Sequence, residues 1–389
     1  MKKLRIYSIL IPFSVLLSIL TMNRINTKLG IPSVGMDATM ILMLYVLSLV
    51  IIRIRGFSAP STSMRRILVM IVLSLMPATF LLTKVSVYPI ILMISIPVGF
   101  FVGKKLYIIH NELDSNNIVL TLILLPAIIG AIWSLLISRN IALFDEGRDF
   151  IFSIVIFFPL IYYCRNYILR FILFFLFAYV ALMSAKRTVI IMIAVSLCLY
   201  LLYNVQYLRK NKLKVVFSIF IVLLLYHISG ANNGFDNFNE AYEMSVERMQ
   251  NLDDASNDNR KYMISTILGG VSSSNILNLI FGHGYNAVTK NLFGNPAHND
   301  YLEIFYDYGI IALLFYLVFI LRLLSYAIAQ IFRNKRVRLN SFYLVNTILI
   351  FLLLSLFNCI LINPLYIYVL MLAIGWSFEH SKSKSISNV

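Results

Sequence analysis

The sequence predicts an all-α polytopic membrane protein with about twelve transmembrane helices, forming a single membrane domain over residues 1–389. Hydrophobic residues make up 60% of the chain, charged residues only 13%, and the mean hydropathy is +0.85. A soluble domain needs more polar surface than this composition supplies. Apolar runs of about 15–22 residues recur along the chain, which is the length that crosses a hydrocarbon core. The alternation of about ten residues that β-barrel strands show is absent.

Charge sets the expected topology of these spans. The chain begins with a basic segment and an apolar run without a small-residue cleavage site, so the first helix is expected to stay uncleaved. With both termini in the cytoplasm, 22 of the 33 Lys and Arg residues fall on the cytoplasmic side. The net charge of +16 therefore indicates topology and contact with anionic lipid, not a nucleic-acid partner. The predicted spans are approximately 6–22, 38–52, 67–83, 85–102, 118–138, 150–164, 168–183, 188–203, 215–229, 304–324, 342–362 and 365–378.

The stretch 168–203 has two readings, because "SAKRT" interrupts 36 mostly apolar residues. A single helix here would turn "RKNKLK" and "RNKRVR" outward and violate the positive-inside rule twice. A hairpin of two helices is therefore predicted. The long loop 230–303, between predicted helices nine and ten, then faces outward. No nucleotide-sugar is available on that side, so a substrate must arrive already activated.

Loop 230–303 is the one long hydrophilic segment, and it is rich in Asn and acidic residues. A loop of this length is usually functional or contains helices of its own. Its clearest pattern is an apolar spacing of i, i+3, i+4 and i+7, which predicts an amphipathic helix on the outer membrane interface. Gly269 and Gly270 are expected to weaken or end that helix. The apolar positions are Ile264, Ile267, Leu268 and Val271.

Basic residues on the outer side are candidates for binding phosphate. Lys186 and Arg187 lie at the outer end of the hairpin, where basic residues are disfavoured, and a guanidinium binds phosphate oxygens with two hydrogen bonds. The alternative is that both side chains snorkel to lipid headgroups. Arg260 is either a second phosphate ligand or an interfacial anchor. For Arg248 the acidic neighbours favour local ion pairing.

His298 in "GNPAHNDYLE" is the candidate general base, since a neutral imidazole near pH 7 can deprotonate a hydroxyl. Pro296 and Asn299 predict a defined turn around it. The alternative is an interfacial histidine that only hydrogen-bonds to the acidic residues just after it. His283 in "FGHGYN" is a rival, although its flanking glycines indicate that backbone geometry matters there.

Acidic residues and cysteines give weaker indications. Asp145 and Glu146 in "ALFDEGRD" can receive a proton or bind a sugar hydroxyl, but a solvated, charge-balanced turn explains them equally well. The cysteines all fall inside apolar runs, so no disulfide framework and no metal-ligand spacing is predicted.

Four motifs come in a set order: "SAKRT" at the hairpin, "SNDNRKYMI" and "GHG" in the loop, and "HNDYLEIFYDYGIIALLFYLV" entering the next helix. Together they resemble the O-antigen polymerase and ligase family, whose members typically carry "HN-x-x-L…G-I-I-G-L" at that junction. The motifs cover roughly residues 180–325, and the first 160 residues resemble the family only in hydropathy. The chain departs from the family pattern in having Lys186 where a small Ser is common and Ala312 in place of the second Gly.

The resemblance implies a GT-C-like glycosyltransferase of the bacterial cytoplasmic (inner) membrane that works without metal or cofactor. It implies that Arg187 and Arg260 contact the donor diphosphate and that His298 acts at the acceptor. The implied partners are a polyprenyl-diphosphate-linked oligosaccharide, an acceptor glycan and membrane lipids. A separate chain-length regulator is compatible with such a role.

Three functions stay open on the sequence. A polymerase adds repeat units to one another, and the specialised outer loop favours it. A ligase would attach finished polymer to a lipid core, and the motifs do not separate the two. A flippase or transporter without chemistry suits twelve spans, but it would concentrate charges along a path inside the helices, which this chain does not do.

Overall fold

The computed structural model is predominantly helical in the residues that it describes, and no strand occurs among them. The all-α class predicted from the sequence is therefore confirmed. The described residues are 44–49, 62–81, 87–113, 120, 123–125, 127–132, 155–164, 166–184, 187–210, 255–294, 296–333, 338–357 and 363–386.

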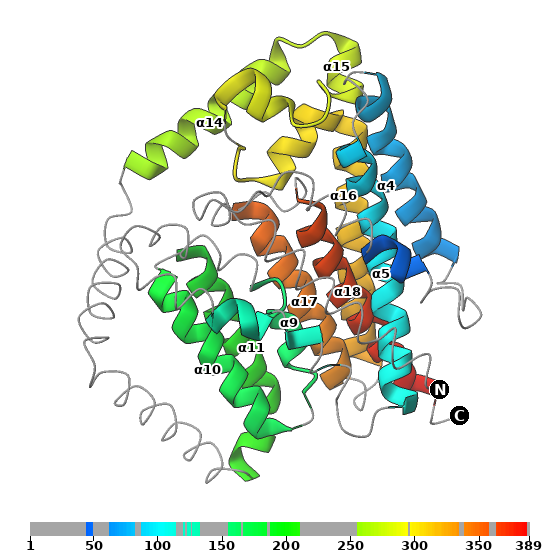
Figure 1. Ribbon diagram of the computed structural model, residues 1–389, viewed down its shortest axis with the longest axis vertical. Helices are drawn as coiled ribbons and strands as arrows, with labels where there is room; N and C mark the ends of the chain where they lie inside the picture. The colour runs from blue at the N-terminus through cyan, green and yellow to red at the C-terminus, as the bar shows by residue number, and fades with distance from the viewer. Residues whose placement is uncertain are drawn as a thin grey trace. The chain divides into compact units, whose positions relative to one another are not determined.

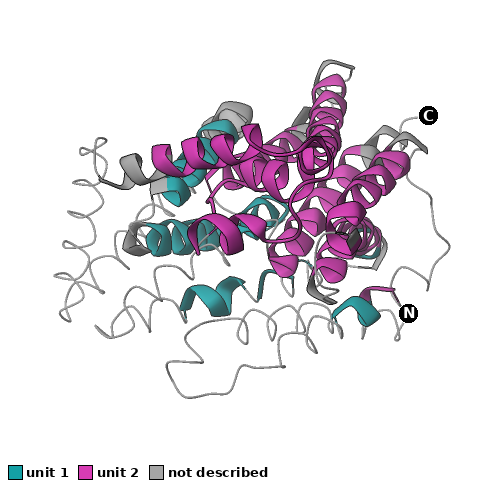
Figure 2. Cartoon of the chain, turned by 90° about the horizontal axis from the view of Figure 1, so that it is seen from above, with its two compact units in different colours: residues 1–47, 109–252 teal, residues 48–108, 253–389 magenta. Residues whose placement is uncertain are grey.

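The chain forms two compact units (Figure 2). Unit 1 comprises residues 1–47 and 109–252, and unit 2 comprises residues 48–108 and 253–389. Helices of unit 1 are α9 (Phe158–Ile161), α10 (Tyr167–Ser184) and α11 (Arg187–Lys210). The long helices of unit 2 are α4 (Thr62–Leu81), α5 (Val87–Leu113, whose last turn is counted in unit 1), α16 (Asp300–Arg333), α17 (Arg338–Phe357) and α18 (Pro364–Ile386). Shorter helices of unit 2 are α14 (Ala255–Ser272), α15 (Ile276–Phe281) and the π-helix η2 (Val288–Phe293).

Two of the described helices contain segments that are long and apolar enough to cross a membrane, Pro89–Asn111 in α5 and Asp300–Ala329 in α16. Shorter apolar helices include Ile168–Ala181, Thr188–Tyr200 and Phe342–Phe357. Only 33% of the most apolar 18-residue window of α16 is buried, so much of its hydrophobic surface is exposed in the structure. The number of twelve spans, the GT-C-like arrangement and the single membrane domain stay predictions.

In unit 1 the predicted hairpin is confirmed as two helices, because α10 ends at Ser184, α11 begins at Arg187, and the two pack against each other (Figure 1). Arg170 near the start of α10 fixes the preceding turn. Its Nε donates to the Cys164 carbonyl at 3.1 Å, and its Nη1 donates to the Tyr200 hydroxyl of α11 at 2.9 Å. The arginine therefore joins both helices of the hairpin to the turn before them.

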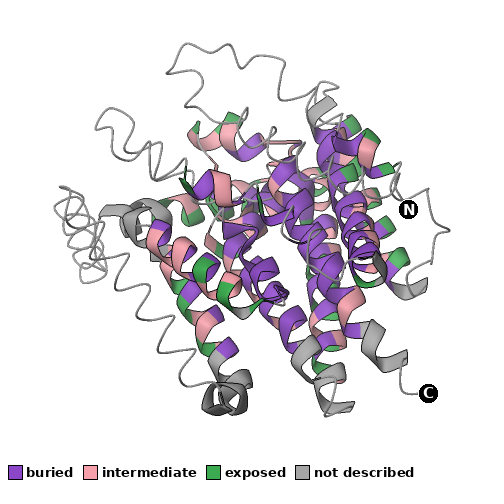
Figure 3. Ribbon diagram, turned by 60° about the horizontal axis from the view of Figure 1, so that its bottom comes forward, coloured by how far each residue is buried: buried purple, intermediate pink, exposed green. Residues whose placement is uncertain are grey.

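In unit 2, α16 packs against α4 and α17, and α17 packs against α18. Buried residues gather where these helices face one another (Figure 3). Every residue of α18 from Ile367 to Phe378 is buried, as expected for a helix that is apolar on all sides. Hydroxyl pairs join the helices inside this core: Tyr316 with Ser355 at 2.8 Å, Thr347 with Ser377 at 3.0 Å, and Ser48 with Tyr368 at 2.7 Å.

Helix α5 approaches α18 through glycines. A Cβ added at Gly103 would overlap the Leu372 backbone, and one added at Gly375 would overlap the Phe100 carbonyl. Gly99 faces the Tyr368 carbonyl in the same way. Small residues four apart let two helix backbones approach closely, which is a common device in membrane bundles. These glycines therefore set the distance between α5 and α18.

The fourth span was predicted to run approximately from residue 85 to residue 102, whereas the long apolar segment of α5 runs from Pro89 to Asn111. Helix α5 continues through Lys104 and Lys105 to Leu113, eleven residues beyond the predicted end. Lys104 is 4% exposed, and its Nζ lies 3.2 Å from Glu379 Oε2 of α18. The carboxylate neutralises the charge that was expected to end the span. Because the two residues are 275 positions apart in sequence, no local pattern could reveal the pair.

Replacing Glu379 by alanine is expected to destabilise unit 2 by about 3–5 kcal/mol, because Lys104 would stay buried without its carboxylate. Thermal unfolding of the purified protein in detergent measures the loss. Lys104→Met combined with Glu379→Leu should recover most of the stability, since well-packed apolar side chains replace such a pair at little cost. A Glu379→Ala protein as stable as the parent would contradict the ion pair's role.

Candidate functional site

The candidate site lies in the part of unit 2 formed by α14, α15, η2 and the start of α16. Figure 1 shows α14 and α15 at the end of unit 2 where α16 begins, and α15 packs against both α16 and α4. The described part of the predicted outer loop thus contains helices of its own, as expected from its length. We call residues 255–309 the cap.

Asn299 joins the start of α16 to the end of α17. Its Oδ1 accepts from the Leu302 N–H at 3.1 Å, so it caps the amino terminus of α16. Its Nδ2 donates at 3.1 Å to the carbonyl of Leu356, one of the last groups of α17, which lack partners within their own helix. The oxygen and the nitrogen of the Asn299 side-chain amide therefore each bind a helix end, the oxygen that of α16 and the nitrogen that of α17. The place of Asn299 among the secondary candidate residues of the site stays a prediction.

The acidic residues that follow Asn299 hold the cap's backbone. Asp300, Glu303 and Asp307 are 0%, 3% and 3% exposed. Glu303 Oε1 accepts from the Ala297 N–H at 2.6 Å, and Asp307 Oδ1 accepts from the Val288 N–H at 2.9 Å. Carboxylates accept such bonds more strongly than neutral groups do. The acidic cluster before the apolar run therefore folds the loop back onto α16, a role that its i, i+4 spacing could have indicated.

Helix α16 is interrupted at Gly309, which has the non-helical angles φ 80° and ψ 179°. The interruption frees two carbonyls of the preceding turn from helical hydrogen bonding. The Tyr306 carbonyl accepts from the His283 N–H at 2.9 Å, and the Asp307 carbonyl accepts from the Gly284 N–H at 2.9 Å. The "GHG" motif and the glycine of "YDYGII" are thus parts of one backbone junction.

His283 reinforces this junction with its side chain. The ring stacks on Tyr306 at a centroid distance of 4.1 Å and an interplanar angle of 11°. Nδ1 donates to the Tyr306 carbonyl at 3.1 Å, and Nε2 lies 2.9 Å from Ser274 Oγ between α14 and α15. Both ring nitrogens are therefore used to hold the α14–α15 turn on α16. A direct role of His283 in chemistry stays a prediction.

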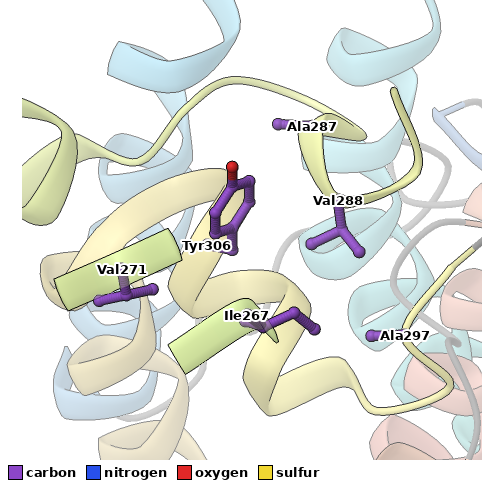
Figure 4. Close-up of a cluster of buried hydrophobic side chains, with 6 residues drawn as sticks. All are labelled: Ile267, Val271, Ala287, Val288, Ala297 and Tyr306. Atoms are coloured by element: carbon purple, nitrogen blue, oxygen red, sulfur yellow. The ribbon is translucent and has the colours of Figure 1, made fainter. Parts of the chain in front are cut away.

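The cap has a small apolar core (Figure 4), made of Ile267, Val271, Ala287, Val288, Ala297 and Tyr306. The amphipathic prediction for α14 was wrong in part. Ile267 and Val271 are 0% and 9% exposed and belong to this core, whereas Ile264 and Leu268 are 42% and 47% exposed. Gly269 and Gly270 do not end the helix, which continues to Ser272.

His298 lies at the exposed turn between the cap core and α16. Its φ of 54° places it in the left-handed region, which is uncommon for a residue other than glycine. The residue before it is held by Glu303 and the residue after it by the two contacts of Asn299. The side chain is exposed. The fold thus presents the imidazole on a backbone that is fixed at both sides.

The remaining predicted site residues are described only in part. Arg187 is the first residue of α11 and Arg260 lies in the first half of α14, and both side chains are outside the described structure. Arg187 belongs to unit 1, whereas Arg260 and His298 belong to unit 2. The convergence of these three residues on one cavity therefore stays a prediction. Lys186, Arg248, Asp145 and Glu146 lie outside the described residues.

Residues 172–317 match the family model Wzy_C, described as O-antigen ligase. The match runs from α10 into α16 and includes Arg187, Arg260, His298 and the Gly309 junction. No curated protein matches the chain. Members of this family are integral membrane proteins and glycosyltransferase-like enzymes. Residues 172–317 are therefore similar to an O-antigen ligase domain, which supports the resemblance to the O-antigen ligase and polymerase family.

Proposed function

We propose that this protein is a polysaccharide polymerase of the O-antigen or capsule type. It transfers a polyprenyl-diphosphate-linked oligosaccharide repeat unit to an acceptor glycan on the outer side of the cytoplasmic membrane. The observation that carries the proposal is the state of His298, exposed on a turn that is fixed at both sides, within the O-antigen ligase match. Such a turn keeps a general base in place without help from the substrate.

In the proposed reaction a hydroxyl of the acceptor sugar attacks the anomeric carbon of the donor. The new bond joins that carbon to the acceptor oxygen, while the bond from the carbon to the diphosphate oxygen breaks. His298 takes the hydroxyl proton, and the polyprenyl diphosphate leaves with the electron pair of the broken bond. One displacement inverts the anomeric configuration.

Charge builds up on the leaving diphosphate, and Arg187 and Arg260 are the groups proposed to stabilise it. Preorganised charges of this kind often make the largest contribution to catalysis. Two guanidinium groups that each bind in bidentate fashion donate four hydrogen bonds to phosphate oxygens, so the proposed reaction proceeds without a metal ion.

The second candidate function is that of a ligase, which transfers finished polymer to a lipid core. The description of the matching family favours it, because that description names O-antigen ligase. The chemistry at the anomeric carbon would be the same, with a different acceptor. The two functions therefore differ in which product is lost with the protein.

The lengths of surface polysaccharide from a deletion strain test the proposal. Loss of long chains with survival of a single capped unit is the expected result for a polymerase. Loss of even the single unit would identify a ligase, and an unchanged ladder would refute both. Complementation with Arg187→Lys or Arg260→Lys should leave the defect in place, because an ammonium cannot form the paired hydrogen bonds of a guanidinium. Arg338→Lys, at the start of α17, is the matched control and should restore full length.

A further inference from the structure

The hydrogen bond between Glu303 and Ala297 fixes the backbone directly before His298. Its length is 2.6 Å from the Ala297 nitrogen to Glu303 Oε1, and the two residues are 3% and 6% exposed. The bond is therefore shielded from water, and its acceptor is a carboxylate in the first turn of α16. Both conditions make such a bond stronger than a neutral bond at the surface.

His298 needs this support, because its left-handed conformation is unfavourable for a residue with a side chain. Such conformations persist where the surroundings determine them, and they are frequent at functional sites. On its other side, His298 is followed by the capping residue Asn299, which is tied to α16 and α17. With one neighbour held on each side, the direction in which the His298 side chain leaves the backbone is set by the fold.

We propose that Glu303 is a positioning residue for His298, which acts by holding the Ala297 N–H and thereby fixing the left-handed turn. The inference rests on the proposed function, in which His298 is the general base. Glu303 itself does not touch the substrate. Its carboxylate is buried beneath the turn that carries the exposed imidazole.

Asp307 provides a matched control, because it is the same kind of group one helical turn further along α16. It is also 3% exposed and accepts a backbone N–H of the cap, that of Val288, at 2.9 Å. The bond that it makes, however, is ten residues before His298 in the chain. If buried carboxylates serve only to fold the cap, variants of Glu303 and Asp307 should behave alike.

The test uses membranes containing the full chain, with lipid-linked repeat units extracted from the deletion strain as donor and acceptor. Glu303→Ala is expected to lower kcat on the order of 10²-fold, as small displacements of a catalytic group do, with KM near that of the parent. Glu303→Gln should restore most of kcat, because its amide oxygen can still accept from Ala297. Asp307→Ala should lower the unfolding temperature, while kcat per folded protein stays close to the parent's.

A double-variant cycle separates positioning from folding. If Glu303 acts through His298, adding Glu303→Ala to a His298→Asn protein should cause little further loss of kcat. Additive losses, or equal losses of kcat in the Glu303 and Asp307 variants, would overturn the inference. If Glu303→Ala fails to fold, Glu303→Asp is the second variant. Its shorter side chain keeps the negative charge but moves the carboxylate oxygen away from the Ala297 N–H. A parental kcat in this variant would also overturn the inference. Full activity of His298→Asn itself would instead refute the proposed function.

Discussion

Replacing His298 by asparagine is expected to stop polymer elongation, with kcat falling about 10²- to 10⁴-fold, while the protein still folds and inserts into the membrane. Asparagine is the sharpest choice because it tolerates the left-handed conformation that φ 54° requires, yet it cannot accept a proton near neutral pH. The side chain of His298 is exposed, so its loss removes little packing. The chain-length ladder of a complemented deletion strain and kcat in membranes measure the effect.

Chemical rescue sharpens this experiment. His298→Gly keeps the turn conformation and leaves space at the surface, so added imidazole should restore part of the activity of this variant. His283→Asn is the comparison, because His283 is held on both ring nitrogens and on its face, and imidazole should not rescue its loss. Normal polymer length in the His298→Asn strain would contradict the chemistry and favour a transporter.

The sequence predicted what depends on local pattern. The end of α10 at Ser184 and the start of α11 at Arg187 were predicted from the basic residues that interrupt an apolar run. Helix α16 was predicted from the apolar segment after His298. The defined turn at His298 was indicated by Pro296 and Asn299 and confirmed by its fixed backbone. These features can be inferred because each is encoded within a few residues.

What the sequence did not predict depends on partners far along the chain. The fourth span was predicted to end just before Lys104, because the carboxylate that pairs with this lysine, that of Glu379, lies on another helix. The stripe on α14 was predicted to face the membrane interface because Tyr306, which shares a buried cluster with Ile267 and Val271, belongs to α16. The sequence shows acidic residues after His298, but it does not show which backbone N–H groups they accept from. Those donors, on Ala297 and Val288, reach Glu303 and Asp307 only when the loop folds back onto α16. The spacing of apolar residues in the sequence predicts which face of a helix is apolar. Which side chains pack against that face depends on the tertiary structure.

The second large effect is expected at the junction between Gly282 and Gly309. Gly309 has φ 80° and ψ 179°, a backbone region that is essentially restricted to glycine. A Cβ there would overlap the Ile280 carbonyl and lie 2.6 Å from the Gly282 nitrogen. At Gly282, with φ 84°, a Cβ would overlap the Asp307 carbonyl. Alanine at either position therefore meets backbone atoms that have no room to move without breaking the hydrogen bonds of His283 and Gly284.

Gly309→Ala is expected to cost more than about 3 kcal/mol, because the conformational strain of roughly 1–3 kcal/mol is added to a backbone clash. The cap should then detach from α16, and the turn that carries His298 should lose its support. Thermal unfolding in detergent measures the stability. Limited proteolysis between residues 255 and 299 should report the loosened cap, and the polysaccharide ladder should shorten.

Two other glycines of the same cap separate the contributions of strain and clash. Gly294 has φ 71° with nothing within 4 Å of an added Cβ, so Gly294→Ala should cost only the strain, about 1–2 kcal/mol. Gly269 lies inside α14 with open space around it, so Gly269→Ala should be neutral or stabilise by up to about 1 kcal/mol. The expected order of stability is thus Gly269→Ala, then Gly294→Ala, then Gly309→Ala. If Gly309→Ala lowered the stability no more than Gly294→Ala does, the contact between the Gly282 and Gly309 turns would not be what holds the cap on α16. The position of His298 would then need another support.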